Sequence, residues 1–283
     1  MINNFADFCL WVYVIVDDIW QEIAPLFDRP GPKPVCSDSE LISMSLIGEC
    51  RGWNLETDML SQWREHRDLF PNIPTQSRFN RRQHKIAELF MVIFEALGLF
   101  WKELNEESVY VIDSFPISAC DNYRIPRCQL YQTEEYRGYQ SSKKRFYYGV
   151  KIHLMVTLHG QPVEFFLTPA SWSDTRALKM YNFDLSENSL VTGDKAYNDY
   201  AFEDLLQAAQ IQLQPLRKKN SHRQYPAWIN YMLACYRKVV ETTGSLIEQL
   251  LPKHIHAVTA RGFELKLAIF VLASSFNFLK VAT

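Results

Sequence analysis

The amino-acid sequence predicts an all-helical region over residues 1–105 and an α/β region over residues 106–283. Helix-period patterns run almost throughout the first region, whereas the second alternates β-prone runs with amphipathic segments. A helical front, a β-hairpin and then alternating strands and helices are typical of two domains. We expect the second domain to be α/β, with a mixed central sheet flanked by helices.

Composition narrows the class of protein. The chain has 283 residues, 47% of them hydrophobic and 22% charged, which is typical of a globular protein and argues against disorder. Its net charge of −2 means that nucleic-acid binding would need local basic clusters. The apolar runs near the two ends are too short or carry lysines, so we expect no membrane span and a cytoplasmic location. The six cysteines form no CxxC pair, which fits a reducing compartment.

In the helical region, Ser37 and Glu40 have the spacing of a capping box ahead of "LISMSLIGEC". The longest helical pattern covers residues 75–97, with an apolar stripe on one face. Another face carries cations at helical spacing: Arg78, Arg81, Arg82 and Lys85. Cations in the first half of a helix oppose its dipole, so this face predicts an anionic partner such as a DNA major groove. The alternative is a solvated basic face.

The α/β region begins with "VYVID", an apolar run expected to form a strand that Pro116 stops. "FYYGVKIHLMVTL" and "QPVEFFLT" then predict a hairpin that turns at His159-Gly160, with His153 in the core or on a sheet face. A helix follows, capped by Asp174. The strand "SLVTGD", a helix near residues 200–209 and the strand "IQLQPL" come next. Helices over 227–250 and 261–280 complete the pattern.

Two of these strands end in aspartate, Asp113 in "VYVIDSFP" and Asp194 in "LVTGDKAYND". Ligand sites in α/β sheets assemble at strand ends, so this matching pair predicts a functional site. The alternative is that each is only a turn or cap residue, Asp194 for a helix near Asn198.

A third acid comes from "YRKVVETTGSLIEQLL", in which Arg237 and Glu241 lie one helical turn apart beside an apolar stripe. The alternative is an ordinary ion pair within one helix. Three carboxylates brought together repel one another unless cations are bound. Oxygen ligands suit Mg²⁺ or Mn²⁺, and two such ions support in-line phosphoryl transfer.

These motifs resemble those of a known family. The order D in "VIDSFP", D in "TGDKAYND" and R-x-x-x-E in "RKVVE" resembles the DDE transposases of bacterial insertion sequences, in the ribonuclease H-like transposase/integrase superfamily. The resemblance implies that Asp113, Asp194 and Glu241 are the catalytic acids and the ligands of two Mg²⁺ or Mn²⁺ ions. "PTQSRFNRRQHKI" resembles the helix-turn-helix-like DNA-binding helices of one branch.

The sequence also departs from the family's pattern. Related transposases often have a tyrosine three residues before the arginine and a lysine seven residues after the glutamate. This chain has Ala234 and Glu248 there, which leaves Glu248 as a second candidate for the third acid.

The resemblance implies a DNA transposase that binds the terminal inverted repeats of an insertion sequence and catalyses metal-dependent cleavage and strand transfer. Its partners would be double-stranded transposon ends and target DNA, held by a homodimer or larger synaptic complex. In the cell it would associate with the nucleoid when bound to DNA. The alternatives are a metal-dependent nuclease without strand transfer and a non-catalytic DNA-binding protein derived from a transposase.

Basic residues near the predicted acids would hold the DNA backbone, with strongly salt-dependent binding. Two clusters flank predicted strands, and two further cations lie next to the acids in sequence. The predicted contacts are Lys143, Lys144, Arg145, Lys195, Arg217, Lys218, Lys219 and Arg237, together with the four cations of residues 78–85.

Overall fold

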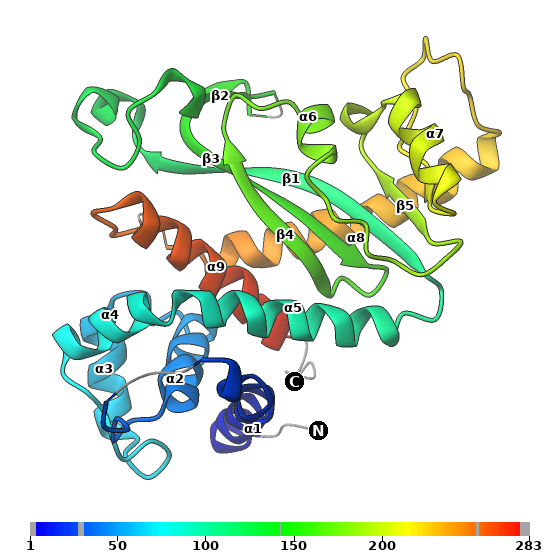
Figure 1. The fold of residues 1–283 in the computed structure, drawn as a ribbon. Helices are drawn as coiled ribbons and strands as arrows, with labels where there is room; N and C mark the ends of the chain where they lie inside the picture. The colour runs from blue at the N-terminus through cyan, green and yellow to red at the C-terminus, as the bar shows by residue number, and fades with distance from the viewer. Residues whose placement is uncertain (1–3, 28–30, 142, 253–254, 278–283) are drawn as a thin grey trace. The chain divides into compact units, whose positions relative to one another are not determined.

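The computed structural model describes residues 4–27, 31–141, 143–252 and 255–277. The chain forms two compact units, and Figure 1 shows the elements of each. The helical unit comprises residues 1–97 and 247–283, and the sheet unit comprises residues 98–246. This division differs from the sequence-based domains, because the last helix groups with the N-terminal helices. Residues 278–280, the end of that predicted helix, lie outside the described part of the chain.

The helical unit is built around a helix buried on nearly all sides, α2. Ser37 Oγ accepts from Glu40 N at 3.0 Å, and Ser37 N donates to Glu40 Oε2 at 2.5 Å, which confirms the capping box. Helices α1 and α9 pack against α2. The elements of this unit are α1 (Phe5–Ile23), η1 (Ala24–Leu26), α2 (Asp38–Cys50), α3 (Glu56–Glu65), α4 (Gln76–Lys85), most of α5 (Ala87–Glu103), the end of α8 (Ala227–Leu250) and α9 (Ala260–Asn277).

The predicted single helix over residues 75–97 is wrong, because α4 ends at Lys85 and α5 begins at Ala87. The break puts Arg82, His84 and Lys85 in the last turn of α4, where free carbonyl groups stabilise cations. The helix dipole therefore favours Arg82 and Lys85, and for these two residues the argument that it demanded an anionic partner does not hold, whereas Arg78 remains in the first turn of α4.

The sheet unit contains a six-stranded mixed sheet in the order β2-β3-β1-β5-β6, with β4 paired to β3. Strand β1 runs antiparallel to β3 and parallel to β5, which in turn runs parallel to β6. This confirms the predicted mixed sheet. The strands are β1 (Val109–Cys120), β2 (Arg137–Gln140), β3 (Arg145–Thr157), β4 (Pro162–Pro169), β5 (Leu190–Gly193) and β6 (Gln212–Leu213).

Strands β3 and β4 form the predicted hairpin. The turn between them includes Gly160, whose φ of +86° favours glycine. His153 lies on β3, fully buried, stacked on Phe166 and hydrogen-bonded through Nε2 to Thr168 Oγ1 at 2.9 Å. Burial lowers the pKa of His153 to about 4, so it stays neutral near pH 7. The predicted core position of this histidine is confirmed.

Strand β1 continues to Cys120, so the prediction that Pro116 stops it is wrong. The pairing of β1 with β5 ends at Ile112, whereas its pairing with β3 runs on past Pro116. Beyond Ile112, β1 is therefore an edge strand on one side. Edge positions tolerate proline because a missing N–H costs no ladder hydrogen bond there.

Helices flank the sheet on both faces, as predicted. On one face, α6 (Asp174–Leu178) and α7 (Tyr200–Ala208) contribute to an apolar core with the sheet. Figure 1 shows α8 running along the other face. There Thr243 Oγ1 donates to the carbonyl oxygen of Gly160 at 3.0 Å. The core cluster comprises Tyr110, Ile112, Met155, Val163, Leu178, Tyr181, Phe183, Val191, Tyr197, Leu206, Ile211 and Leu213. No helix among the described residues is long and apolar enough to cross a membrane.

Candidate active site

Asp113 and Asp194 lie side by side, Asp113 within β1 where its pairing with β5 ends and Asp194 directly after β5. Strands β1 and β5 pair in parallel up to Ile112 and Gly193, and the next residue on each strand is an aspartate. Side chains alternate along a strand, and Ile112 and Val191 point into the core shared with α6 and α7. Asp113 and Asp194, one position out of phase with these residues, therefore point toward the face that α8 covers.

Helix α8 brings an arginine and a glutamate to this pair. Arg237 Nη1 lies 3.2 Å from Asp194 Oδ1, and Arg237 Nη2 lies 2.9 Å from Glu241 Oε1. The ion pair within the helix is present, but the same guanidinium also reaches the end of β5. Asp194 is not a helix cap through its side chain, because Asp199 caps α7 by accepting from Phe202 N at 3.2 Å.

Asp113 is partly buried, and its carboxylate accepts from Ser114 N at 2.8 Å. The pKa of Asp113 is raised to about 6, chiefly by burial and to a smaller extent by the charges of Asp194 and Asp174. The Ser114 hydrogen bond and the positive charge of Arg237 act in the opposite direction. The negative charge of Asp113 is thus only partly balanced by its neighbours, and this favours the binding of a cation.

Sequence reasoning missed the contacts that α6 makes behind the two strand ends. Asp174 Oδ1 accepts from Ser114 Oγ at 2.8 Å and lies 3.2 Å from Lys151 Nζ. Thr175 Oγ1 donates to the carbonyl oxygen of Ala196 at 2.8 Å. The predicted capping role of Asp174 is wrong, because Ser173 caps α6. The available signal was a run of polar residues, "SWSDT", directly after a strand.

The acids suit a divalent ion by type, since Mg²⁺ and Mn²⁺ prefer carboxylate oxygens. Over the described residues, no group of three or more His, Cys, Asp or Glu side chains is arranged to hold a metal ion. Instead, the Arg237 guanidinium supplies the positive charge between Asp194 and Glu241. The ligand type is therefore present, with an arginine joining two of the three acids.

The second candidate for the third acid, Glu248, also lies on α8 and is exposed. It lies seven residues beyond Glu241, about 10 Å along the helix axis. It belongs to the stretch of α8 assigned to the helical unit, whereas Glu241 belongs to the sheet unit.

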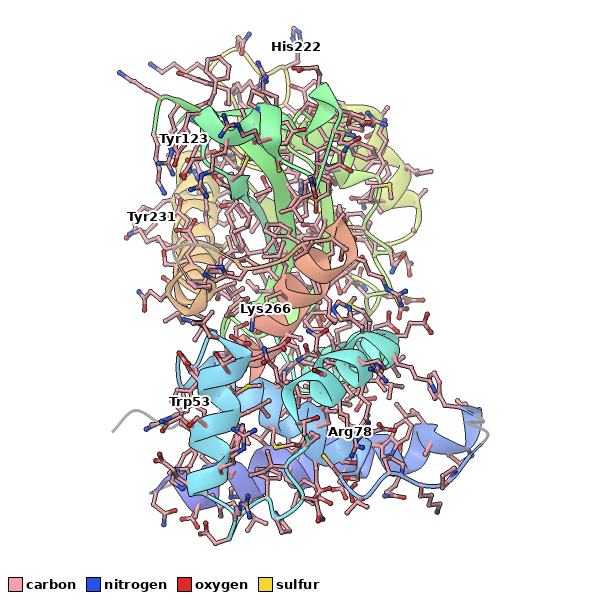
Figure 2. All side chains as sticks on the ribbon, turned by 90° about the vertical axis from the view of Figure 1, so that its left-hand side faces the viewer. Trp53, Arg78, Tyr123, His222, Tyr231 and Lys266 are labelled. Atoms are coloured by element: carbon pink, nitrogen blue, oxygen red, sulfur yellow. The ribbon has the colours of Figure 1, made fainter. Side chains whose placement is uncertain are left out.

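In the helical unit, three of the four predicted DNA contacts are exposed: Arg78, Arg81 and Lys85. Figure 2 labels Arg78. Arg82 differs, because it bonds to Asp38 Oδ1 at 2.7 Å and to the Cys36 carbonyl oxygen at 2.6 Å. Arg82 thus joins α4 to the start of α2, which corrects its predicted role as a phosphate contact.

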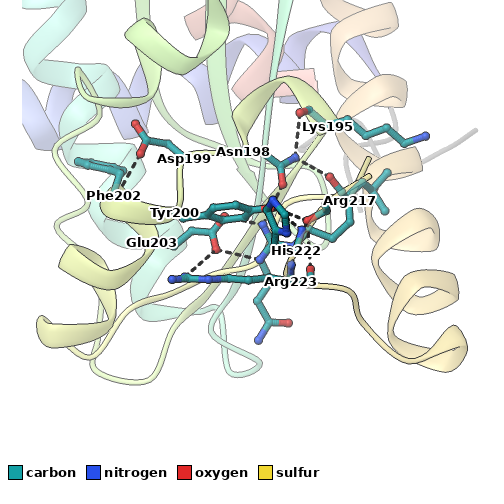
Figure 3. A network of polar contacts seen from close by, with 12 residues as sticks. Lys195, Asn198, Asp199, Tyr200, Phe202, Glu203, Arg217, His222 and Arg223 are labelled. Atoms are coloured by element: carbon teal, nitrogen blue, oxygen red, sulfur yellow. Dashed lines mark hydrogen bonds and ion pairs between the residues drawn. The ribbon is translucent and has the colours of Figure 1, made fainter. Parts of the chain in front are cut away.

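In the sheet unit, the cations divide in the same way. The exposed ones are Lys143, Lys144, Arg145, Lys195, Lys218 and Lys219. Arg217 is 3% exposed and makes paired hydrogen bonds to Glu203, at 2.5 and 2.8 Å, and one to Asn198 at 2.8 Å (Figure 3). The prediction that Arg217 contacts DNA is therefore wrong in this structure.

Comparison with known proteins shows that the candidate acids lie within a family domain. The sequence matches the family described as "Transposase DDE domain" over residues 104–257, which include Asp113, Asp194, Glu241 and Glu248. Domains of this family generally use divalent metal ions. Comparison with curated proteins gave no match. Among solved structures, the chain is similar to a piggyBac transposase synaptic complex with hairpin DNA, at 10% identity and a TM-score of 0.45, over 95% of this chain and 72% of that one.

Proposed function

Because this chain belongs to the family of transposases with a DDE domain, we propose that its acids on β1, β5 and α8 perform the chemistry of a DNA transposase. The element it moves would be a bacterial insertion sequence, with terminal inverted repeats as the recognised ends. The observation that supports this site best is the in-register placement of Asp113 and Asp194, with Arg237 linking Asp194 to Glu241.

Asp113, Asp194 and Glu241 would hold two divalent ions, Mg²⁺ or Mn²⁺. Two bound ions would activate a water or hydroxyl nucleophile and stabilise both oxygens of an in-line phosphoryl displacement. Asp113 supports this role because its raised pKa would fall once a cation compensates its charge. Glu241 is favoured over Glu248 because Arg237 joins it to Asp194.

Arg237 would have two kinds of partner. Its guanidinium offsets the charges of Asp194 and Glu241. The planar guanidinium fork would also suit a DNA phosphate bound beside the acids. Lys195, exposed directly after Asp194, would contact the backbone beside it.

Double-stranded DNA, both transposon ends and target, would be the partner. The exposed cations Arg78, Arg81 and Lys85 support a DNA-binding role for the helical unit, with phosphate contacts setting register. On the sheet unit, the clusters at residues 143–145 and 218–219 would hold backbone near the acids. Two ends must be joined to one target, so we expect a homodimer or larger synaptic complex.

A strand-transfer assay tests this function. The protein, Mg²⁺ and pre-cut DNA of the element's end are incubated with a supercoiled plasmid, and joined products are expected. Cleavage without joined products would support a nuclease instead, and DNA binding with neither product would support a non-catalytic protein.

The same assay identifies the third acid through a matched pair of variants on α8. Glu241→Gln should abolish joining, whereas Glu248→Gln should retain it. The opposite result would assign the role to Glu248 and leave the aspartate pair in place.

A further inference from the structure

The short helix α6 contacts the chain directly after both strand-end aspartates. Its first residue, Asp174, bonds to Ser114, which follows Asp113 on β1. Its second residue, Thr175, bonds to Ala196, two residues after Asp194. Adjacent residues of one element thus hold the two segments that carry the proposed metal-binding pair. We call these two contacts the α6 bridge.

We propose that Asp174 and Thr175 are positioning residues, which fix the spacing of Asp113 and Asp194 and so prepare the pair to bind a divalent ion. This inference rests on the proposed function of the two aspartates. Neither Asp174 nor Thr175 is assigned to the reacting groups. They act through Ser114 and Ala196.

On the β1 side, the bridge continues to the carboxylate itself. Ser114 donates its hydroxyl to Asp174 Oδ1 at 2.8 Å and its backbone N–H to Asp113 at 2.8 Å. Ser114 is therefore held by α6 through its side chain while it orients the Asp113 carboxylate through its backbone. Beyond Ile112 this part of β1 has no β5 partner, so α6 supplies a lateral contact that the sheet does not.

On the β5 side, the strand ends at Gly193 and the chain turns through η4 (Lys195–Tyr197). Thr175 Oγ1 bonds to the Ala196 carbonyl within this turn at 2.8 Å. The hydrogen bond limits movement of the segment that presents Asp194. Hydrogen bonds from residues behind the ligands commonly orient metal ligands in this way.

The bridge itself is anchored. Lys151, on β3, donates to the Trp172 carbonyl oxygen at 2.8 Å and lies 3.2 Å from Asp174 Oδ1. Ala177 and Leu178 of α6 are fully buried. The helix is thus fixed to the sheet from two directions, and the charge of Asp174 has a cationic partner.

Loss of either contact should weaken metal binding more than it slows the reaction at saturating metal. Asp174→Ala should lower Mn²⁺ affinity about tenfold, the lower end of the effect for residues that support metal ligands. Thr175→Val, which keeps the shape but not the hydroxyl, should give a smaller loss. Asp174→Asn and Thr175→Ser keep the hydrogen-bonding atoms and should restore affinity toward wild type.

The measurements are Mn²⁺ affinity by calorimetry without DNA, the Mn²⁺ concentration for half-maximal cleavage, and kcat at saturating Mn²⁺. Thermal unfolding of the full chain checks that each variant folds. Ser173→Ala is the matched control, because it removes the α6 cap without touching Ser114 or Ala196. It should leave Mn²⁺ affinity unchanged.

Folded Asp174→Ala and Thr175→Val proteins with wild-type Mn²⁺ affinity would overturn the inference, as would an equal loss in Ser173→Ala. If Asp174→Ala does not fold, Thr175→Val against Thr175→Ser decides the question. A wild-type protein that binds no Mn²⁺ would overturn the proposed function and this inference together. Normal wild-type binding with unaffected variants would overturn only the α6 bridge.

Discussion

Two arginine–carboxylate clusters in the sheet unit differ in how completely their charges are balanced. In the Arg217 cluster, Arg217 and Arg223 face Glu203 (Figure 3), and Arg223 also pairs with Asp204. In the Arg237 cluster, Arg237 contacts Asp194 and Glu241, and Asp113 lies beside them. The first cluster has two cations for two acids, whereas the second has one cation for three.

Burial differs as well. The side chains of Arg217 and Glu203 are 3% and 6% exposed, whereas those of Asp194 and Glu241 are 34% and 50% exposed. A buried and balanced pair holds structure, because removing one partner leaves a buried charge. An accessible cluster with surplus negative charge can accept a cation. Balance and exposure, and not the pairing of arginine with acid, thus separate the candidate site from a structural network.

The largest predicted effect is on activity at the Arg237 cluster. Asp113→Asn and Asp194→Asn should each reduce Mg²⁺-dependent cleavage of end DNA by about 10³-fold or more, because each removes a charged ligand. The matched change in the other cluster, Asp204→Asn, should stay within about twofold because Asp204 is exposed. Equal losses in both clusters would remove the distinction between them.

The next largest effect is on stability, and here a change in the Arg217 cluster should cost more than a change in the Arg237 cluster. Arg217→Met should lower the free energy of unfolding by about 3 kcal/mol, because buried Glu203 then keeps only the 3.5 Å contact with the more exposed Arg223. Arg237→Met should change it by less than about 1 kcal/mol, since its partners are well exposed. Urea unfolding of both variants measures this difference, and a costly Arg237→Met would contradict it.

A third effect concerns pH. The pKa of Asp113 is raised from 3.8 to about 6, so the folded protein binds a proton at this carboxylate more tightly than the unfolded chain does. The contribution of Asp113 to wild-type stability therefore falls as pH rises from about 4 to 6. Above pH 6, metal-free Asp113→Asn should be more stable than wild type by about 1–2 kcal/mol. His153 titrates with the opposite sign, but it is common to both proteins and cancels in the difference. A constant difference from pH 4 to 8 would contradict the assignment.

The smallest effect should appear in DNA affinity beside the Arg217 cluster. Lys218→Glu with Lys219→Glu should weaken binding to end DNA about tenfold and reduce the salt dependence, because both lysines are exposed. The two changes should leave urea unfolding unaffected, unlike Arg217→Met next to them. Fluorescence anisotropy at several salt concentrations measures the affinity, and unchanged binding would exclude this patch as a DNA contact.

The strands that carry the two aspartates were predictable because they depend on local patterns. An apolar run followed by aspartate correctly predicted the end of β5 before Asp194, whereas Asp113 lies within β1, where its pairing with β5 ends. The helix with Arg237 and Glu241 followed from periodicity and has the predicted bounds. The mixed sheet and the β3–β4 hairpin followed in the same way.

Partner choice was not predictable. Both Arg82 and Arg217 lie in basic runs of the sequence, where they were predicted to contact DNA. In the structure, Arg82 pairs with Asp38 and Arg217 pairs with Glu203, and each acid belongs to the same unit as its arginine. The break at Ile86 and the extension of β1 past Pro116 depend on neighbours that no local pattern identifies. Asp174 read as a helix cap, but its contact with Ser114 spans 60 residues.

The sequence by itself determined which acids this chain has, which apolar runs form strands and which helix carries the arginine and glutamate. Those features depend on side-chain periodicity and local backbone preference, which are properties of neighbouring residues. Only the tertiary structure decided which arginine is buried and balanced, which acids keep surplus charge, and which helix holds the two strand ends. Burial and pairing are set by residues far apart in the chain, and they determine the free energy of every charge.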